Sequence, residues 1–223
     1  MRSAALIAVL ALLAAAKAET HADPRDLAKG RLLIAARDLA DPNFAETVVL
    51  LTGYGPDGAA GLVITRPSRL TIADLFERTE SPRGEERVWR GGPVQRTGML
   101  ALLRAKRGPE GAQTVLPGIH LLTSRESLET ALGTSEGTLK VFLGYAGWGG
   151  GQLEHEVELG TWHILNPRPD DIFAPDTSTL WERLARRMER RIARLHRRPE
   201  RTRFRHTSID GQTAARMVRG RRR

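Results

Sequence analysis

Short apolar runs bounded by glycine, proline or charged residues are the main pattern along the first two thirds of the chain. Their length and their content of valine, isoleucine and leucine are typical of buried β-strands. The segment YGPDGAAG between two of these runs has the Pro-Asp-Gly chemistry of a reverse turn, which predicts a β-hairpin that ends at Pro67. Strands are predicted within residues 31–37, 47–51, 61–65, 118–124 and 138–144.

Helix-start signals occur between the predicted strands. Asp23 followed by Pro24 is one such signal, and Thr123 with Glu126 forms a capping box. The polar stretch 78–90 contains proline and glycine and is predicted as a surface loop. Helices or helical turns are predicted over residues 23–30, 41–46, 71–77, 124–132 and 152–159.

The length and composition favour one globular domain. A chain of 223 residues with 40% hydrophobic content can bury one core. The predicted domain covers residues 30–196, after a lead-in segment at 19–29 and before a tail at 197–223. Because the chain has no cysteine, it lacks disulfides, thiolate nucleophiles and zinc-thiolate sites.

Residues 1–18 have the pattern of a signal peptide. Arg2 supplies a positive end, residues 4–16 are apolar, and Ala16-Lys17-Ala18 fits a signal-peptidase site. An apolar stretch of this length is too short to span a bilayer, which needs about 20 residues. The mature chain is therefore predicted to be exported without a transmembrane segment. The alternative is an alanine-rich first helix of a cytoplasmic protein.

The positive charge of the chain lies at its C-terminal end. Residues 181–223 carry sixteen arginines and four acids, a formal charge of +12, which leaves −3 for residues 1–180. An apolar stripe beginning at Leu180 predicts an amphipathic helix anchored by Trp181, whereas residues 197–223 are predicted to be disordered. This basic tail is a candidate for binding nucleic acid or an anionic surface. The alternative is a solvated end without a partner.

The segment GYAGWGGGQLEHEVELG, residues 144–160, matches no complete catalytic motif. A Walker phosphate loop needs lysine and then serine or threonine where this chain has Gln152 and Leu153, and the glycine spacing does not fit a dinucleotide site. A zinc protease motif needs a second histidine at the position of Leu159. The chain also lacks a G-x-S-x-G motif. No metal and no cofactor is therefore predicted.

The same segment can bind through its backbone. Glycines before a helix leave N–H groups accessible beside a partial positive charge, so a small anion is predicted near Gly150, Gly151 and Gln152. Tyr145 and Trp148 are predicted walls of that pocket. The alternative is that the glycines adopt positive φ and the two aromatic residues fill the core.

Four motifs occur in a fixed order within residues 27–187. They are GRLLIAARDLADPNFAETVVLL, GAAGLVITRP, GGPV, and LGYAGWGGGQLEHEV followed by TW. In this order they closely resemble the YqgE/AlgH family. The resemblance implies a single compact α+β domain, with a branched β-sheet that is partly closed as a small barrel and surrounded by helices.

The resemblance also implies candidate binding residues. The family pattern resembles GLVINRP, so Thr65 replaces an amide side chain that both donates and accepts hydrogen bonds. Together with Gly150 from the anion hypothesis, the candidates are Thr65, Arg66, Pro67, Gly91, Gly92, Pro93, Gly144, Tyr145, Gly147, Trp148, Gly151 and Gln152.

The function implied by the resemblance is broad, because the family is largely uncharacterised and some members carry only a transcriptional-regulator label. We predict a non-enzymatic binding or regulatory module whose partner is a small anion or a protein. The alternative is an enzyme acting on a small anionic substrate. That enzyme would need a pocket in which Glu154, His155 or Glu156 meets a polar group from GLVITRP or GGPV.

Overall fold

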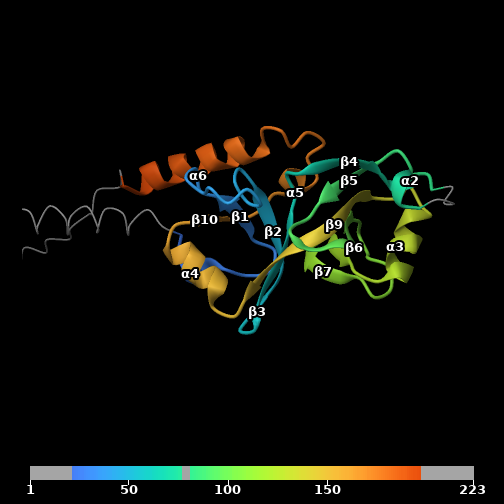
Figure 1. Ribbon diagram of the computed structural model, residues 1–223, viewed down its shortest axis with the longest axis horizontal. Coiled ribbons are helices and arrows are strands. Elements are labelled where there is room, and N and C mark those ends of the chain that lie inside the picture. The colour runs from blue at the N-terminus through green and yellow to red at the C-terminus, as the bar shows by residue number, and fades with distance from the viewer. Residues whose placement is uncertain (1–21, 77–80, 197–223) are drawn as a thin grey trace, which may run out of the picture.

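The computed structural model describes residues 22–76 and 81–196, which form a mixed α/β domain built on one large sheet (Figure 1). The predicted signal peptide and basic tail lie outside these residues. The strands are β1 (Leu32–Ala35), β2 (Val48–Gly55), β3 (Gly58–Val63), β4 (Pro67–Thr71), β5 (Arg87–Arg90), β6 (Val94–Arg104), β7 (Gln113–Leu116), β8 (Ile119–Leu122), β9 (Thr138–Gly149) and β10 (Trp162–Leu165). The helices are η1 (Pro24–Asp26, a 3-10 turn), α2 (Ile72–Leu75), α3 (Arg125–Leu132), α4 (Gln152–Glu158), α5 (Pro169–Ile172) and α6 (Leu180–His196).

Strand β9 organises the sheet because it changes partners along its length. Its first half pairs antiparallel with β6 and parallel with β5, whereas its second half pairs antiparallel with β3. The strand order is β10-β1-β2-β3-β9-β6-β8-β7, and β4 is attached through β5. The sheet therefore branches at β9, which passes between the two halves of the domain (Figure 1).

The predicted partial closure into a barrel is wrong. β10 and β7 stand at opposite ends of the strand order, and within the described residues these two edges do not pair. Because β9 exchanges one set of partners for another in the middle of the strand, its hydrogen bonds extend the sheet on both sides instead of joining its edges.

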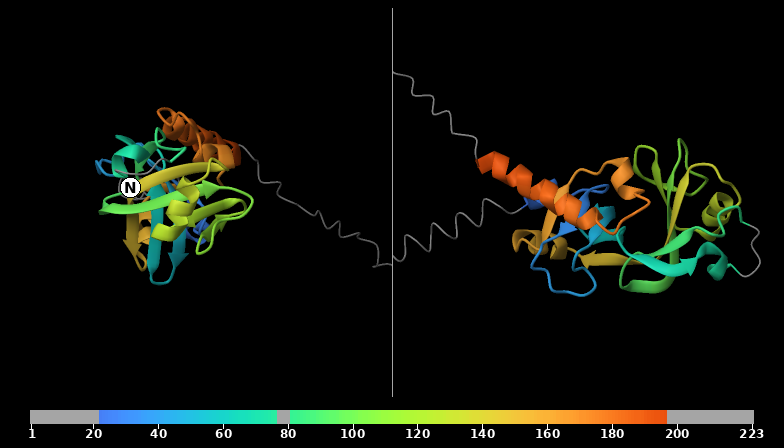
Figure 2. Two further views of the ribbon diagram at one scale, coloured as in Figure 1. Left: turned by 90° about the vertical axis from the view of Figure 1, so that its right-hand side faces the viewer. Right: turned by 90° about the horizontal axis from the view of Figure 1, so that it is seen from above.

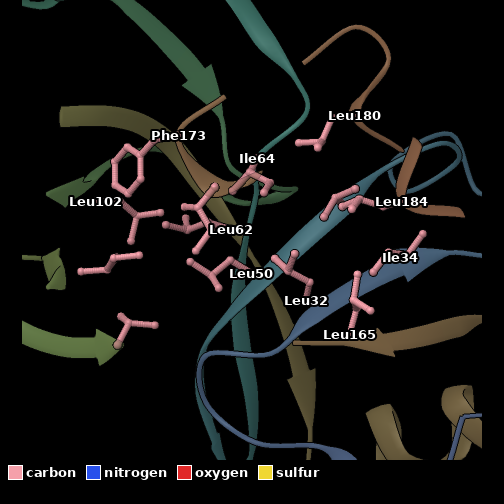
Figure 3. Close-up of a cluster of buried hydrophobic side chains, with 14 of the residues drawn as sticks. Leu32, Ile34, Leu50, Leu62, Ile64, Leu102, Leu165, Phe173, Leu180 and Leu184 are labelled. Atoms are coloured by element: carbon pink, nitrogen blue, oxygen red, sulfur yellow. The ribbon is translucent and has the colours of Figure 1, made fainter. Parts of the chain in front are cut away.

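Strand β1 is buried on both faces. Strand residues alternate in direction, so Leu32 and Ile34 enter one hydrophobic cluster while Leu33 and Ala35 enter another. Helix α6 covers the first cluster, where Figure 3 shows Leu184 beside residues of β1, and α4 covers the second. Figure 2 shows α6 lying across the outside of this half of the domain. Burial on both faces explains the continuous apolar run of the β1 sequence.

The five predicted strands are confirmed, as is the hairpin between β2 and β3. Five strands were missed: β4, which begins at Pro67, β5, which lies within the predicted loop 78–90, and β6, β7 and β10. The predicted cap of α3 is wrong by one residue. The Oγ of Ser124, not Thr123, accepts the N–H of Ser127 at 3.2 Å.

Helix α6 is held by its aromatic anchor and by part of its arginine face. The Nε1–H of Trp181 donates to the carbonyl of Ala35 at 2.9 Å, as an anchor requires. The buried carboxylate of Asp171 on α5 lies 2.9 Å from Arg183 and 3.6 Å from Arg187. These two arginines therefore fasten α6 to α5. Across residues 22–76 and 81–196, no helix is long and apolar enough to cross a membrane.

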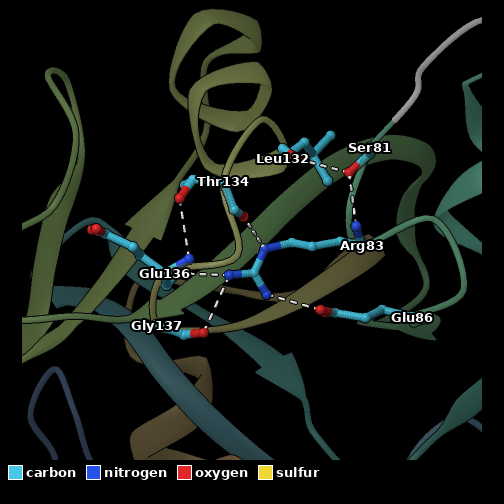
Figure 4. A network of polar contacts seen from close by, with 7 residues as sticks. All are labelled: Ser81, Arg83, Glu86, Leu132, Thr134, Glu136 and Gly137. Atoms are coloured by element: carbon cyan, nitrogen blue, oxygen red, sulfur yellow. Dashed lines mark hydrogen bonds and ion pairs between the residues drawn. The ribbon is translucent and has the colours of Figure 1, made fainter.

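The segment 81–86 has no helix or strand, as predicted, but it is anchored to the domain through Arg83 (Figure 4). The Arg83 side chain is only 4% exposed and donates to the carbonyls of Thr134, Glu136 and Gly137, at 2.7, 2.7 and 3.2 Å. It also pairs with Glu86 at 2.8 Å. One guanidinium thus satisfies the carbonyl groups of the connection between α3 and β9.

Lys140 is the buried lysine of β9. Its Nζ donates to the carbonyl of Ala174 at 3.3 Å and lies 3.9 Å from the ring centroid of Trp89. Burial lowers the pKa of Lys140 from 10.5 to about 8. In the folded chain the ammonium therefore loses its proton at a lower pH than it does in the unfolded chain.

This difference predicts a pH-dependent stability. The cost of burying the charge is fully present below pH 8, and it disappears as the unfolded chain also deprotonates near pH 10.5. Relative to Lys140→Met, the wild-type free energy of unfolding should rise by up to about 3 kcal/mol between these values. Urea unfolding across that pH range measures the difference, with the exposed Lys106→Met as control. Parallel wild-type and Lys140→Met profiles would contradict the prediction.

Candidate anion-binding site

A cavity of about 470 Å³ lies beside the point where β9 changes partners. Three arginines line it, together with two short polar side chains and an apolar wall. The lining residues are Pro42, Asn43, Val63, Arg66, Ser68, Leu70, Arg90, Gly92, Pro93, Arg96 and Leu143. We call this space the arginine cavity.

Gly92 and Pro93 of the GGPV segment line the arginine cavity, and this segment crosses β9 at very short range. Gly91 donates its N–H to the carbonyl of Leu143 at 2.8 Å and accepts from the N–H of Val63 at 2.8 Å. A Cβ on Gly92 would lie 2.2 Å from the carbonyl carbon of Tyr145. Only residues without side chains allow this approach, so the double glycine has a steric cause.

The third arginine of the wall lies where the pairing of β6 with β9 is interrupted by a bulge. The pairing with β9 moves from Val94 opposite Tyr145 to Met99 opposite Leu143, so residues 95–98 stand opposite one residue of β9. Gln95 has φ of 45°, in the left-handed region that non-glycine residues rarely adopt. Such bulges redirect side chains next to binding sites, and here the redirected residue is Arg96.

Arg66 and Arg90 are neighbours across β4 and β5. The N–H of Arg90 donates to the carbonyl of Arg66 at 2.9 Å, and the Nη2 of Arg66 donates to the carbonyl of Ala45 at 3.2 Å. Burial, followed by the positive charge of Arg90, lowers the pKa of Arg66, while Asp41 acts in the opposite direction. Asp41 does not line the cavity. The two guanidinium groups thus repel each other inside a partly enclosed space.

The charge of the arginine cavity is not compensated from within. None of the described residues that line it is aspartate or glutamate. Arginine presents several N–H donors in a planar fork that fits carboxylate, sulfate or phosphate oxygens. The arrangement therefore suits an anion, and the apolar wall suits a ligand that also carries uncharged surface.

The end of β9 and helix α4 form a separate cluster. The carboxylate of Glu156 accepts hydrogen bonds from the indoles of Trp148 and Trp162, at 2.9 and 2.8 Å, and from Gln152 at 3.0 Å. Trp148 is buried and stacks on Phe44. For Trp148 the structure thus shows the core-filling alternative, and Glu156 has a structural role.

The neighbouring acid, Glu154, also has an internal partner. Its carboxylate accepts from the hydroxyl of Tyr54 at 2.6 Å, and this hydrogen bond raises the pKa of Tyr54 to about 12. The side chain of His155 is 70% exposed. Neither residue lines the arginine cavity, so the convergence that the enzyme alternative requires does not occur there. Within the described residues, no group of three or more His, Asp or Glu side chains is placed to hold a metal ion.

Residues 32–193 match the family model described as AlgH-like, DUF179. The chain belongs to the AlgH-like family. A UPF0301 protein of Streptomyces coelicolor is 36% identical to this AlgH-like chain over 170 residues, which cover 74% of the chain and 88% of that protein. The resemblance to the YqgE/AlgH family is therefore confirmed.

Two solved structures share the AlgH-like fold. The solution structure of the AlgH protein from Pseudomonas aeruginosa is 32% identical, with a TM-score of 0.58 over 73% of this chain and 87% of that one. A crystal structure of a protein from Corynebacterium diphtheriae is 22% identical, with a TM-score of 0.61 over 72% of this chain and 87% of that one. The second likeness concerns the fold alone.

The binding residues predicted for this AlgH-like chain lie in several places. Arg66, Gly92 and Pro93 line the arginine cavity. Gly91, Gly144 and Tyr145 form the close crossing of GGPV and β9, and Pro67 begins β4. Gly147 and Trp148 lie in the second half of β9, and Gly150, Gly151 and Gln152 connect β9 to α4.

The predicted strand before the AlgH-like glycine stretch is too short. β9 continues from Leu143 through Gly149, so only Gly150 and Gly151 form the turn before α4. Gly151 is the N-cap with φ of 76°, which agrees with the positive-φ alternative. The Gly149 N–H donates to the side chain of Gln152 at 3.1 Å. The anion site near Gly150 stays a prediction.

Thr65 keeps a polar role in the AlgH-like chain despite the missing amide. Its Oγ1 accepts the N–H of Val48 at 3.2 Å, which joins the end of β3 to β2. Sequence reasoning missed Arg90 and Arg96, although both flank the GGPV motif in RGGPVQR. Their adjacency to the motif was the available signal, but residue 90 had been placed in a surface loop.

Proposed function

We propose that this protein is a binding or regulatory module that recognises a small anion in the arginine cavity. The supporting observation is a wall with three arginines and, among its described lining residues, no acid. The positive charge of Arg90 contributes to the lowered pKa of the partly buried Arg66, which indicates repulsion between the two groups. A bound anion would remove that repulsion, and this gain favours binding.

The lining chemistry supports binding over catalysis. Among the described lining residues there is no histidine, lysine, tyrosine, aspartate or glutamate to transfer a proton near neutral pH. Ser68 is the hydroxyl in the cavity, and it accepts the N–H of Leu70 at 3.1 Å. A serine nucleophile needs an adjacent base, which this wall does not supply.

Sulfate should raise the melting temperature of the full-length wild-type protein above that in sodium chloride of equal ionic strength. At about ten times the dissociation constant, the expected rise is about 3 °C. Arg66→Gln and Arg90→Gln should abolish the specific part of this shift, which differential scanning fluorimetry measures.

Arg107→Gln is the matched control, because Arg107 is exposed and does not line the cavity. It should keep the wild-type shift. Sulfate also stabilises proteins by exclusion from their surface, and the arginine-rich C-terminal end can attract it, but both contributions should persist in all three variants. An undiminished shift in Arg66→Gln and Arg90→Gln would overturn the proposed function.

Export of the mature chain and binding of nucleic acid or an anionic surface by residues 197–223 stay predictions, because both segments lie outside the described residues. They are compatible with a binding module and do not depend on the arginine cavity.

A further inference from the structure

The proposed anion site carries a further inference about its ligand. Resting on the proposed function, we infer that the arginine cavity binds a small organic phosphate. Its phosphoryl group would lie between Arg66 and Arg90, and its uncharged body would lie against the apolar side chains of Leu70 and Leu143. The inference has three supports: the number of charges, their placement, and the composition of the remaining wall.

The first support is the number of charges held together. Arg66 and Arg90 are adjacent through a backbone hydrogen bond and both line the cavity, so both guanidinium groups can contact one ligand. A monoanion such as a carboxylate would neutralise one of them. A phosphate monoester carries a charge of about −1.5 to −2 near pH 7 and has three acceptor oxygens, which match two guanidinium groups.

The second support is the position of the third arginine. Arg96 lies on the bulge at residues 95–98, and the Arg96 Cα stands close to Gly144, where a Cβ on that glycine would be 3.2 Å away. The three arginines thus come from different segments: Arg66 directly precedes β4, Arg90 ends β5 and Arg96 belongs to β6. A tetrahedral group presents oxygens in several directions, whereas a planar carboxylate presents them in one plane.

The third support is the space beyond the arginines. A cavity of about 470 Å³ is much larger than one tetrahedral ion needs and falls in the range of small-molecule sites. Leu70 is 40% exposed, unusually high for a large hydrophobic residue in this domain, and it lines the cavity together with the half-buried Leu143. Apolar surface at this place suits the organic part of a ligand.

Isothermal titration of the full-length protein with four probes tests this inference. Phenyl phosphate and benzoate share a ring and differ in the anionic group, whereas methyl phosphate and inorganic phosphate lack the ring. Phenyl phosphate should bind at least ten-fold more tightly than each of the other three. Arg66→Gln should weaken the binding of phenyl phosphate by more than ten-fold.

Leu70→Ser tests the apolar wall, and Leu159→Ser is its control. Leu159 is 64% exposed and does not line the cavity. Leu70→Ser should weaken the binding of phenyl phosphate about three-fold or more and leave the binding of inorganic phosphate unchanged. Leu159→Ser should change the affinity for neither ligand. Melting temperatures within a few degrees of wild type would show that each variant is folded.

The outcomes separate this inference from the proposed function. If benzoate binds as tightly as phenyl phosphate and Arg66→Gln weakens both, the anion site stands and the phosphate inference is overturned. If methyl phosphate binds as tightly as phenyl phosphate, or if Leu70→Ser does not change the affinity for phenyl phosphate, the role of the apolar wall is overturned. If no probe binds, or Arg66→Gln changes nothing, the inference and the proposed function both fail.

Discussion

Gly92→Ala should lower the free energy of unfolding by about 3 kcal/mol or more, because the new methyl group would enter the backbone of β9. Its Cβ would lie 2.2 Å from the Tyr145 carbonyl carbon, 2.3 Å from the Tyr145 oxygen and 2.4 Å from the Ala146 nitrogen. These are main-chain atoms of the longest strand, so they cannot rotate away as a side chain would. Urea unfolding followed by tryptophan fluorescence measures the loss.

Gly55→Ala is the matched control for this substitution. Gly55 ends β2 next to the hairpin turn, and a Cβ there would meet no atom within 4 Å. Its unfolding midpoint should therefore stay close to that of the wild type. A Gly92→Ala midpoint equal to that of Gly55→Ala would show that GGPV does not need to approach β9 as closely as described here.

Arg83→Met should destabilise the domain by about 3–5 kcal/mol, because it removes a buried charge that serves four acceptors. Methionine fills a similar volume but donates no hydrogen bond, so the carbonyls of Thr134, Glu136 and Gly137 lose their partner. The connection between α3 and β9 should also exchange its amide hydrogens faster. Urea unfolding and hydrogen exchange measure the two effects.

Arg87→Met controls for the removal of an arginine from the same region. Arg87 is exposed at the start of β5, and its loss should change stability by no more than about 0.5 kcal/mol. Equal stabilities of the two variants would mean that the Arg83 contacts contribute nothing beyond those of a surface arginine. Unchanged exchange at residues 134–137 would likewise contradict the anchoring role.

The contacts of Gly92 and Arg83 show why local sequence patterns predicted the structure around these residues only in part. The GGPV motif was recognised as a candidate binding segment, and two of its residues line the arginine cavity. The reason for its glycines, contact with residues 144–146, lies about fifty positions further along the chain. The segment around Arg83 was predicted as a loop because its polarity was visible and its distant carbonyl partners were not.

Only part of the lining of the arginine cavity was among the residues singled out from the sequence. Arg66, Gly92 and Pro93 came from motif resemblance, and all three line the cavity. The same resemblance grouped them with Trp148 and Gln152, which belong to the α4 cluster at the far end of β9. An extended strand separates residues by about 3.3 Å each, so neighbours in a motif can stand at different sites.

By itself, the sequence determined the family from four ordered motifs. It also determined five of the ten described strands, the β2–β3 hairpin and the burial of β1, because these follow from local turn chemistry and from contiguous apolar residues. Only the tertiary structure decided that the sheet stays open, that β5 joins it parallel to β9, and that Arg90 and Arg96 meet Arg66. These features depend on which distant strands pair and in which register. Pairing energy of that kind is shared between segments and is not contained in either one alone.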